Sequence, residues 1–257
     1  MMMHYLDPGK AGDPAILFLH GLGANATSWT LQLDALMAAG FRPIAPDLPG
    51  FGESAYDGRG WSFKRMAALL ADLVNGLGAA PVHLVGLSMG GVVAQQLALD
   101  APQLVRSLTL VSTFSVLRPK NLSQWLYFIQ RLVVVHTLGL ERQSKLVSRR
   151  VFPGPGQEEL RRMAEAQIAS ADPRAYRAAM RCLGLFNSSK RLAEIKIPTL
   201  VISGADDSTV PLEHQTLLAK SIPGARQVII PKAGHAAAID QAETFNRYLL
   251  EFYRTLP

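Results

Sequence analysis

Along most of this chain, short runs of apolar residues alternate with longer stretches in which apolar residues recur every three or four positions. Runs of this length, rich in branched side chains, predict buried β-strands. Six of them stand out: Ala15–Leu19, Arg42–Ala45, Val82–Val85, Ser107–Ser112, Thr199–Ser203 and Gln227–Ile230. A shorter run, His4–Leu6, predicts one further strand at the edge of the sheet.

The stretches between these runs have helical periodicity. The predicted helices are Ser28–Ala39, Phe63–Leu77, Gly91–Asp100, Leu212–Ser221 and Gln241–Phe252. Strands that alternate with helices form a mainly parallel sheet covered by helices on both faces. The pattern therefore predicts an α/β fold with a mainly parallel, doubly wound sheet.

Residues 115–191 break this alternation, because they contain no convincing strand and are helical in pattern throughout. A turn-rich segment, Phe152–Gly156, divides them in two. We interpret 115–191 as a helical cap inserted into a core domain made of residues 1–114 and 192–257. Apolar residues at spacings of three and four place one stripe on a single helix face: Leu122, Trp125, Leu126, Ile129 and Val133. This stripe would form the core of the cap or line a substrate cavity beneath it.

The pentapeptide Gly86-Leu87-Ser88-Met89-Gly90 lies between the predicted strand Val82–Val85 and the helix that begins at Gly91. Gly-x-Ser-x-Gly between a strand and a helix is typical of a nucleophile elbow, a tight turn that exposes its serine above the sheet. The small neighbours are needed because the serine adopts a sparsely populated backbone conformation. Ser88 is therefore the candidate nucleophile.

Serine is a poor nucleophile at neutral pH, so Ser88 needs a base, and the base needs an orienting acid. His235 follows the last predicted strand, in a loop of the kind where parallel sheets assemble their active sites. The other histidines occupy the N-terminal region, the end of the first long strand, a strand interior, the cap and a helix start: His4, His20, His83, His136 and His214. Position and elimination thus favour His235 as the base.

The acid is expected between the serine and the histidine in chain order. Asp206 and Asp207 both follow the strand Thr199–Ser203, and no acid follows the earlier strand at Ser112. The residues alone leave both aspartates open as the partner of His235.

At this point the chain resembles the α/β-hydrolase fold superfamily, in particular its capped branch of serine esterases, lactonases and C–C hydrolases. Besides the elbow, the resemblance rests on His-Gly-x-Gly at His20–Gly23, the glycine-rich run Asp47–Ser54, and Gly-x-x-Asp-x-x-Val-Pro at Gly204–Pro211. In that family the acid stands three residues after the glycine, which implies Asp207. The resemblance also implies an oxyanion hole made by the backbone N–H groups of Leu22 and Met89. It assigns His20 a structural role in holding its loop.

A serine nucleophile favours acyl transfer over the chemistry of hydrolases in which an aspartate attacks carbon. Several residues expected near Ser88 are aromatic: Trp29, Trp125, Phe128 and Phe152. Such a pocket suits an acyl chain or an aromatic acid better than a sugar or a peptide. The leading hypothesis is a carboxylesterase for short to medium or aromatic acyl groups. The alternatives are a C–C bond or enol-lactone hydrolase acting on ring-cleavage products, and a ligand receptor of the same fold.

The 257 residues suffice for one α/β domain with an insertion, and no apolar run reaches the length of a membrane span. A single cysteine, Cys182, excludes an internal disulfide framework. With no pattern of a signal peptide at the N-terminus, we expect a cytoplasmic protein. We expect a small-molecule ester or lactone substrate, a monomer or homodimer, no cofactor, no metal site and no nucleic-acid partner.

The net charge of +6 is unevenly distributed. Residues 114–191 contain 14 lysines and arginines against 5 aspartates and glutamates, whereas the remainder contains 12 against 15. This basic region would attract anionic substrates, lipid headgroups or acyl carriers, or would simply form the solvated faces of helices.

Overall fold

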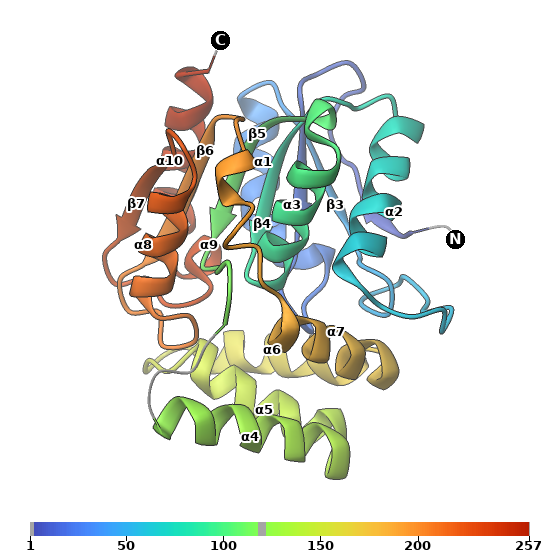
Figure 1. The fold of residues 1–257 in the computed structure, drawn as a ribbon, viewed down its shortest axis with the longest axis vertical. Coiled ribbons are helices and arrows are strands. Elements are labelled where there is room, and N and C mark those ends of the chain that lie inside the picture. The colour runs from blue at the N-terminus through green and yellow to red at the C-terminus, as the bar shows by residue number, and fades with distance from the viewer. Residues whose placement is uncertain (1–2, 118–121, 257) are drawn as a thin grey trace.

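A seven-stranded, mainly parallel sheet forms the centre of the computed structural model, which describes residues 3–117 and 122–256 (Figure 1). In spatial order the strands are β1 (Tyr5–Leu6), β3 (Arg42–Pro46), β2 (Ala15–Leu19), β4 (Val82–Leu87), β5 (Val105–Val111), β6 (Thr199–Gly204) and β7 (Arg226–Ile230). β1 runs antiparallel to β3, and every other pair of neighbours is parallel. The predicted fold class is confirmed.

Helices cover both faces of the sheet. One face carries α2 (Phe63–Gly76), α3 (Met89–Asp100) and α8 (Leu212–Ser221), and the other carries α1 (Thr30–Ala38), α9 (Ala237–Asp240) and α10 (Ala242–Arg254). Short 3₁₀ turns are η1 (Ala26–Trp29), η2 (Pro102–Leu104) and η3 (Leu192–Glu194). Every strand and helix predicted for the core domain overlaps an observed element.

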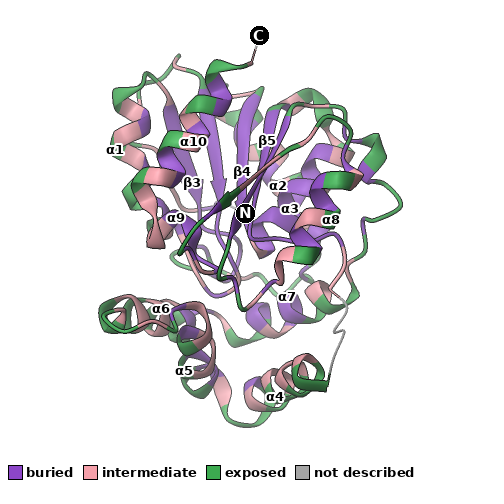
Figure 2. Ribbon diagram, turned by 90° about the vertical axis from the view of Figure 1, so that its left-hand side faces the viewer, coloured by how far each residue is buried: buried purple, intermediate pink, exposed green. Residues whose placement is uncertain are grey.

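Two apolar cores result because successive side chains of a strand point to opposite faces. In β2, Leu17 and Leu19 pack with α2 and α3, whereas Ile16 and Phe18 pack with Trp29 and α10. All five residues of β2 and all six of β4 are buried. Figure 2 shows β4 in purple. The strand that leads to Ser88 is therefore held rigidly on both sides.

Four helices lie beyond the carboxyl ends of the strands, and we call them the cap helices (Figure 1). They are α4 (Leu122–Thr137), α5 (Gly139–Val151), α6 (Glu158–Ser170) and α7 (Pro173–Leu185). The turn-rich segment Phe152–Gly156 falls between α5 and α6, as predicted. Within the described residues, neither the cap nor the core contains a helix with the length and apolarity needed to cross a membrane.

The prediction for the apolar stripe of α4 is wrong. Its members are between 49% and 73% exposed: Leu122, Trp125, Leu126, Ile129 and Val133. They neither form the core of the cap nor line a cavity, and Figure 2 shows α4 with little buried surface. A second stripe with the same spacing, Gln124, Tyr127, Phe128 and Arg131, faces the interior instead.

Candidate active site

Ser88 occupies a strained turn between β4 and α3. Its backbone angles, φ 54° and ψ −111°, lie in a region that L-residues rarely adopt. The end of β5 and the segment after it hold the turn: the Ser88 N–H donates to the carbonyl of Val111 at 2.9 Å, and the Thr113 hydroxyl donates to the Ser88 carbonyl at 2.8 Å. Such strain persists only where the surroundings enforce it, and it is characteristic of functional turns.

Glycines allow the backbone to pack tightly around this turn. A Cβ added to Gly86 would lie 2.4 Å from the carbonyl oxygen of Gly90, and one added to Gly90 would lie 2.1 Å from that of Leu19. Neither position accepts a side chain, because real Cβ atoms do not approach so closely. The pattern Gly-x-Ser-x-Gly is thus required by the approach of three backbone segments.

Asp207 and His235 form a buried pair. The Nδ1–H of His235 donates to the carboxylate of Asp207, with Nδ1 3.0 Å from Oδ2 and 3.1 Å from Oδ1. The two residues come from the loops that follow β6 and β7. With Nδ1 donating to the carboxylate, Nε2 of His235 is left to accept a proton.

The surroundings of Asp207 keep it ionised. Burial raises the pKa of this carboxyl group. Its interaction with His235 and the hydrogen bonds that the carboxylate accepts lower the pKa by more, so the pKa lies below its usual range. The backbone N–H groups of Thr209 and Val210 donate to Oδ1, and the amide of Gln215 donates to Oδ2 at 3.0 Å. Asp206, the other candidate acid, is exposed.

The loops that carry the acid and the histidine are joined through their backbones. Asp206 N–H donates to the carbonyl of Ala233 at 2.9 Å, and Ala205 N–H donates to that of Ile230 at 3.0 Å. A Cβ on Gly204 would lie 2.2 Å from the Gly234 carbonyl oxygen, so only glycine permits this approach. The Asp207–His235 geometry is therefore fixed by the main chain as well as by the side chains.

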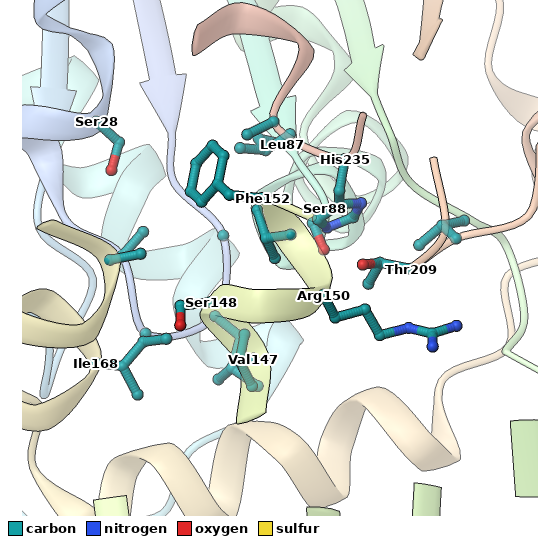
Figure 3. A pocket seen from close by; sticks show the side chains of 18 of the residues that line it. Ser28, Leu87, Ser88, Val147, Ser148, Arg150, Phe152, Ile168, Thr209 and His235 are labelled. Carbon is teal, nitrogen blue, oxygen red and sulfur yellow. The ribbon is translucent and has the colours of Figure 1, made fainter. Parts of the chain in front are cut away.

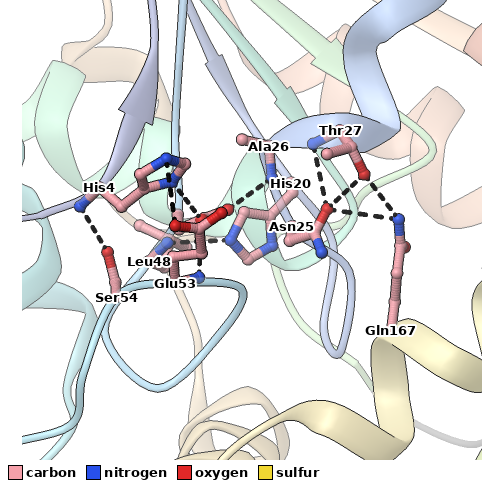
Figure 4. A network of polar contacts seen from close by, with 10 residues as sticks. His4, His20, Asn25, Ala26, Thr27, Leu48, Glu53, Ser54 and Gln167 are labelled. Carbon is pink, nitrogen blue, oxygen red and sulfur yellow. Dashed lines mark hydrogen bonds and ion pairs between the residues drawn. The ribbon is translucent and has the colours of Figure 1, made fainter.

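His20 holds the loop that carries Leu22. Its Nδ1 lies 2.8 Å from the Gly21 carbonyl. Its Nε2 accepts the N–H of Leu48 at 2.9 Å, as Figure 4 shows. Because Nε2 accepts, Nδ1 carries the proton and the ring is neutral. Burial lowers the pKa of His20, which agrees with this neutral form. The structural role implied for His20 by the family resemblance is consistent with these contacts.

A second polar network supports the same loop from the glycine-rich run. The buried carboxylate of Asp47 accepts from the N–H groups of Ala26 and Glu53 and pairs with His4 at 2.8 Å. The cap reaches this loop too, because Gln167 of α6 donates to the Thr27 hydroxyl at 3.0 Å (Figure 4). Asp47 is therefore part of the scaffold beneath the loop.

A cavity of about 380 Å³ opens between the core and the cap, and both Ser88 and His235 line it (Figure 3). Gly21 and Leu22, from the loop after β2, also line it, and a Cβ built on Gly21 would lie 3.7 Å from Cβ of Ser88. Most other lining side chains are apolar, among them Phe114, Leu117, Val147, Ile168, Met180 and Ile239. The structure thus brings a strained serine, a histidine–aspartate pair and a glycine loop to one apolar cavity.

The model of the alpha/beta hydrolase fold family matches residues 14–242 of this sequence. The chain belongs to this family. A protein of Variovorax paradoxus with the provisional name carbamate hydrolase RutD is 35% identical over 98% of this chain and 96% of its own length. The 2-hydroxy-6-oxononadienedioate/2-hydroxy-6-oxononatrienedioate hydrolase of Burkholderia vietnamiensis is 32% identical over 99% of this chain and 91% of its own length.

The fold of this α/β hydrolase is also that of solved structures. The enol-lactonase from Burkholderia xenovorans superposes with a TM-score of 0.89 and 25% sequence identity, covering 98% of this chain and 96% of its own. Hydrolase activity is thus supported by the family and by the names of its members.

Two of the four predicted aromatic substrate contacts lie elsewhere in this α/β hydrolase. Trp29 is 1% exposed and packs in the core between Phe18 and Phe245, with ring centroids 4.7 and 6.3 Å away. Trp125 is 50% exposed on the outer face of α4. Phe128 and Phe152 do line the cavity, and Phe152 is shown in Figure 3.

Met89, the other predicted oxyanion donor, is the first residue of α3, and its side chain is fully buried. Its backbone N–H lies at the N-terminus of a helix, where unpaired N–H groups and the helix dipole favour negative charge. Leu22, by contrast, lies on the loop at the cavity wall.

Sequence reasoning missed two polar residues around the site of this hydrolase. Thr113 anchors the carbonyl of Ser88, and Asp240 accepts a hydrogen bond from the N–H of Gly234, next to His235, at 2.8 Å. Thr113 lies two residues after β5, the strand next to β4 in the sheet, and this position is a signal that could have been used. Asp240 carries no such signal, because its role depends on a tertiary contact.

Proposed function

We propose that this α/β hydrolase cleaves carboxylic esters of short to medium or aromatic acyl groups through an acyl-enzyme on Ser88. The observation that carries the proposal is the meeting of Ser88 with the Asp207–His235 pair in one apolar cavity. A strained serine beside an oriented histidine is the arrangement that nucleophilic acyl transfer needs.

In the first half-reaction, Nε2 of His235 takes the proton of the Ser88 hydroxyl as its oxygen attacks the ester carbonyl. Asp207 holds the ring by accepting from Nδ1–H and stabilises the imidazolium that forms. His235 then gives the proton to the leaving alkoxide, and the acyl group stays on Ser88. In the second half-reaction a water molecule attacks the acyl-enzyme in the same way and releases the acid.

The negative charge on the carbonyl oxygen needs donors that are already in place. The backbone N–H groups of Leu22 and Met89 are the proposed pair, one from the loop held by His20 and one at the start of α3. The short distance between Gly21 and Ser88 supports this placement. Loss of one such donor typically raises the barrier by about 3 kcal/mol.

Replacement of either reacting side chain tests the assignment. Ser88→Ala and His235→Ala are expected to abolish hydrolysis of p-nitrophenyl butyrate while far-ultraviolet circular dichroism and the melting temperature stay close to those of the wild type. Turnover at the wild-type rate in either folded variant would refute the proposed catalytic residues. A series of p-nitrophenyl esters from acetate to palmitate then defines the preferred acyl length.

A second candidate is hydrolysis of an enol-lactone or of a C–C bond next to a ketone. It is favoured by the relative named as an oxononadienedioate hydrolase and by the likeness to the enol-lactonase. In both reactions the site at Ser88 would attack a carbonyl carbon or transfer a proton to a group next to it. Comparing kcat/KM on simple esters, on an enol-lactone and on a vinylogous diketo acid separates this candidate from the first.

A further inference from the structure

We propose that Arg131 and Arg150 of the cap helices form an anion-binding subsite in the cavity, so that the preferred substrate carries a carboxylate besides its scissile carbonyl. This inference rests on the proposed function, since it names the substrate class of the same site. Arg131 lies on α4 and Arg150 on α5, and both line the cavity that contains Ser88.

The buried guanidinium of Arg131 has a donor that no acceptor in the described structure satisfies. One Nη atom donates to the hydroxyl of Tyr176 at 3.2 Å, while the Nε atom is buried and has no hydrogen-bond partner in the described part of the chain. A buried donor without an acceptor is costly, and more so on a charged group. A ligand oxygen would satisfy this Nε–H.

Arg150 shows the same incomplete pairing. Its guanidinium donates to the backbone carbonyl of Ser208, and its Nε atom is likewise buried without a partner among the described residues. Figure 3 shows its side chain extending beside Thr209, on the side of the cavity where Ser88 and His235 lie. The hydroxyl of Thr209 also lacks a hydrogen-bond partner in the described structure.

The two guanidinium groups share one aromatic ring. Cζ of Arg131 lies 5.8 Å and Cζ of Arg150 lies 4.3 Å from the ring centroid of Tyr127. Contact with an aromatic face stabilises each cation. The ring does not neutralise their charge, so two like charges contact one aromatic side chain.

The cavity offers these arginines no internal counter-charge. None of the described residues that line it is an aspartate or a glutamate, and neither arginine forms an ion pair with a residue that the structure describes. Other cap arginines do pair with carboxylates: Arg161 with Glu158, Arg162 with Glu159, and Arg174 with Asp172. Arg131 and Arg150 therefore face the cavity without a carboxylate partner among the described residues.

A carboxylate is the ligand that this arrangement fits. The planar guanidinium presents paired donors that match the two oxygens of a carboxylate, which an uncharged acyl chain cannot use. Bound between the cap arginines, the carboxylate would relieve their repulsion and satisfy the buried Nε–H groups. The apolar wall would then hold the chain between this end and the carbonyl at Ser88.

Binding is tested without turnover in the Ser88→Ala protein. The melting temperature is measured with succinate, glutarate and adipate, each against its neutral diamide at equal ionic strength. At least one dicarboxylate is expected to raise the melting temperature clearly more than its diamide does. Adding Arg131→Met or Arg150→Met should remove that difference, whereas Arg162→Met, an exposed cap arginine paired with Glu159, should preserve it.

Specificity is tested by the ratio of kcat/KM for mono-p-nitrophenyl glutarate to that for p-nitrophenyl valerate. We expect Arg131→Met to lower this ratio at least tenfold, with Arg131→Lys intermediate because it keeps the charge but not the paired donors. A purely structural role would lower both rates together and leave the ratio unchanged. Arg162→Met is again the matched control.

The results distinguish a failure of the ester proposal from a failure of the anion subsite. If no ester is hydrolysed but a dicarboxylate stabilises the protein in an arginine-dependent manner, the ester proposal falls and the anion subsite stands. If esters are hydrolysed, yet no dicarboxylate is distinguished from its diamide and the ratio is unchanged in Arg131→Met, the subsite is refuted.

Discussion

The side-chain amide of Gln157 donates a hydrogen bond of 3.0 Å to the carboxylate of Asp240. The same carboxylate accepts the N–H of Gly234, the residue before His235, at 2.8 Å. Gln157 lies at the start of α6, and its Oε1 accepts the N–H of Gly154 in the preceding turn. One carboxylate therefore links the segment that carries the histidine to the turn between two cap helices.

From this link we predict that Asp240→Asn lowers kcat for p-nitrophenyl butyrate about tenfold. An asparagine offers one acceptor oxygen instead of two and places its own NH₂ against a donor, which costs about 1–3 kcal/mol. Gln157→Ala breaks only the bond to the cap and should lower kcat less. Equal effects of the two variants would show that Asp240 acts through the cap and not through the histidine segment.

The two neighbouring aspartates give a direct test of the acid. Asp207→Asn is expected to lower kcat by about 10²–10⁴, because an amide does not hold the required tautomer of His235 or stabilise its cation. Asp206 is exposed and directly precedes Asp207. Asp206→Asn should therefore leave kcat within about twofold of the wild type. Steady-state kinetics on p-nitrophenyl butyrate decide the matter, and the reverse order of effects would contradict the assignment.

Gly50 and Gly58 form a matched pair for the docking of the cap. Both have positive φ, 90° and 74°, but a Cβ on Gly50 would lie 2.1 Å from Cβ of Ala175 in α7, whereas one on Gly58 meets nothing within 4 Å. Gly58→Ala should cost about 1 kcal/mol of stability from backbone strain alone, and Gly50→Ala at least about 1–3 kcal/mol more from the clash. Urea unfolding measures the loss of unfolding free energy in both variants. Equal losses would mean that α7 moves aside for the added methyl group at no cost.

His83 predicts a dependence of stability on pH. Burial, helped by the charge of Arg106, lowers the pKa of this histidine to about 4. In the unfolded chain its pKa is about 6.5, so between roughly pH 6.5 and 4 only the unfolded chain binds the proton. The contribution of His83 to stability should therefore fall by about 3 kcal/mol as the pH falls through this window, and then level off.

Replacing His83 isolates this contribution. Its ring contacts Tyr253 at a centroid distance of 4.4 Å and hydrogen-bonds the Ser107 hydroxyl at 2.8 Å, so His83→Gln will be less stable at every pH. The diagnostic quantity is the change in unfolding free energy between pH 7 and pH 4.5, which should be roughly 2–3 kcal/mol smaller in His83→Gln. His136 is exposed, and in His136→Gln the change in unfolding free energy between the two pH values should equal that of the wild type.

The sheet was predictable because its strands are short, apolar and buried on both faces, as in β2 and β4. The positions of Ser88, Asp207 and His235 could also be predicted from the sequence, since each follows a strand at the same edge of the sheet. Local sequence determines both the strand and the turn after it, so this part of the molecule requires little tertiary information.

The orientation of α4 was not predictable in this way. Its two stripes have the same helical spacing, and periodicity does not say which of them turns inward. The more apolar stripe, with Trp125, faces outward, while the stripe with Tyr127 and Arg131 faces the cavity. The position of Trp29 was mispredicted for a related reason. It follows the loop Gly21–Gly23 closely in sequence, yet its ring packs into the apolar core with Phe18 and Phe245.

The close backbone approach at Gly90, where no side chain fits against Leu19, has a consequence for how this protein can change over time. This contact holds the end of β2 against the start of α3, so the backbone around Ser88 tolerates little change. The cap residues around Tyr127 belong to separate helices and carry no such constraint. Substitutions in the cap can therefore reshape the wall of the cavity while this backbone contact stays intact.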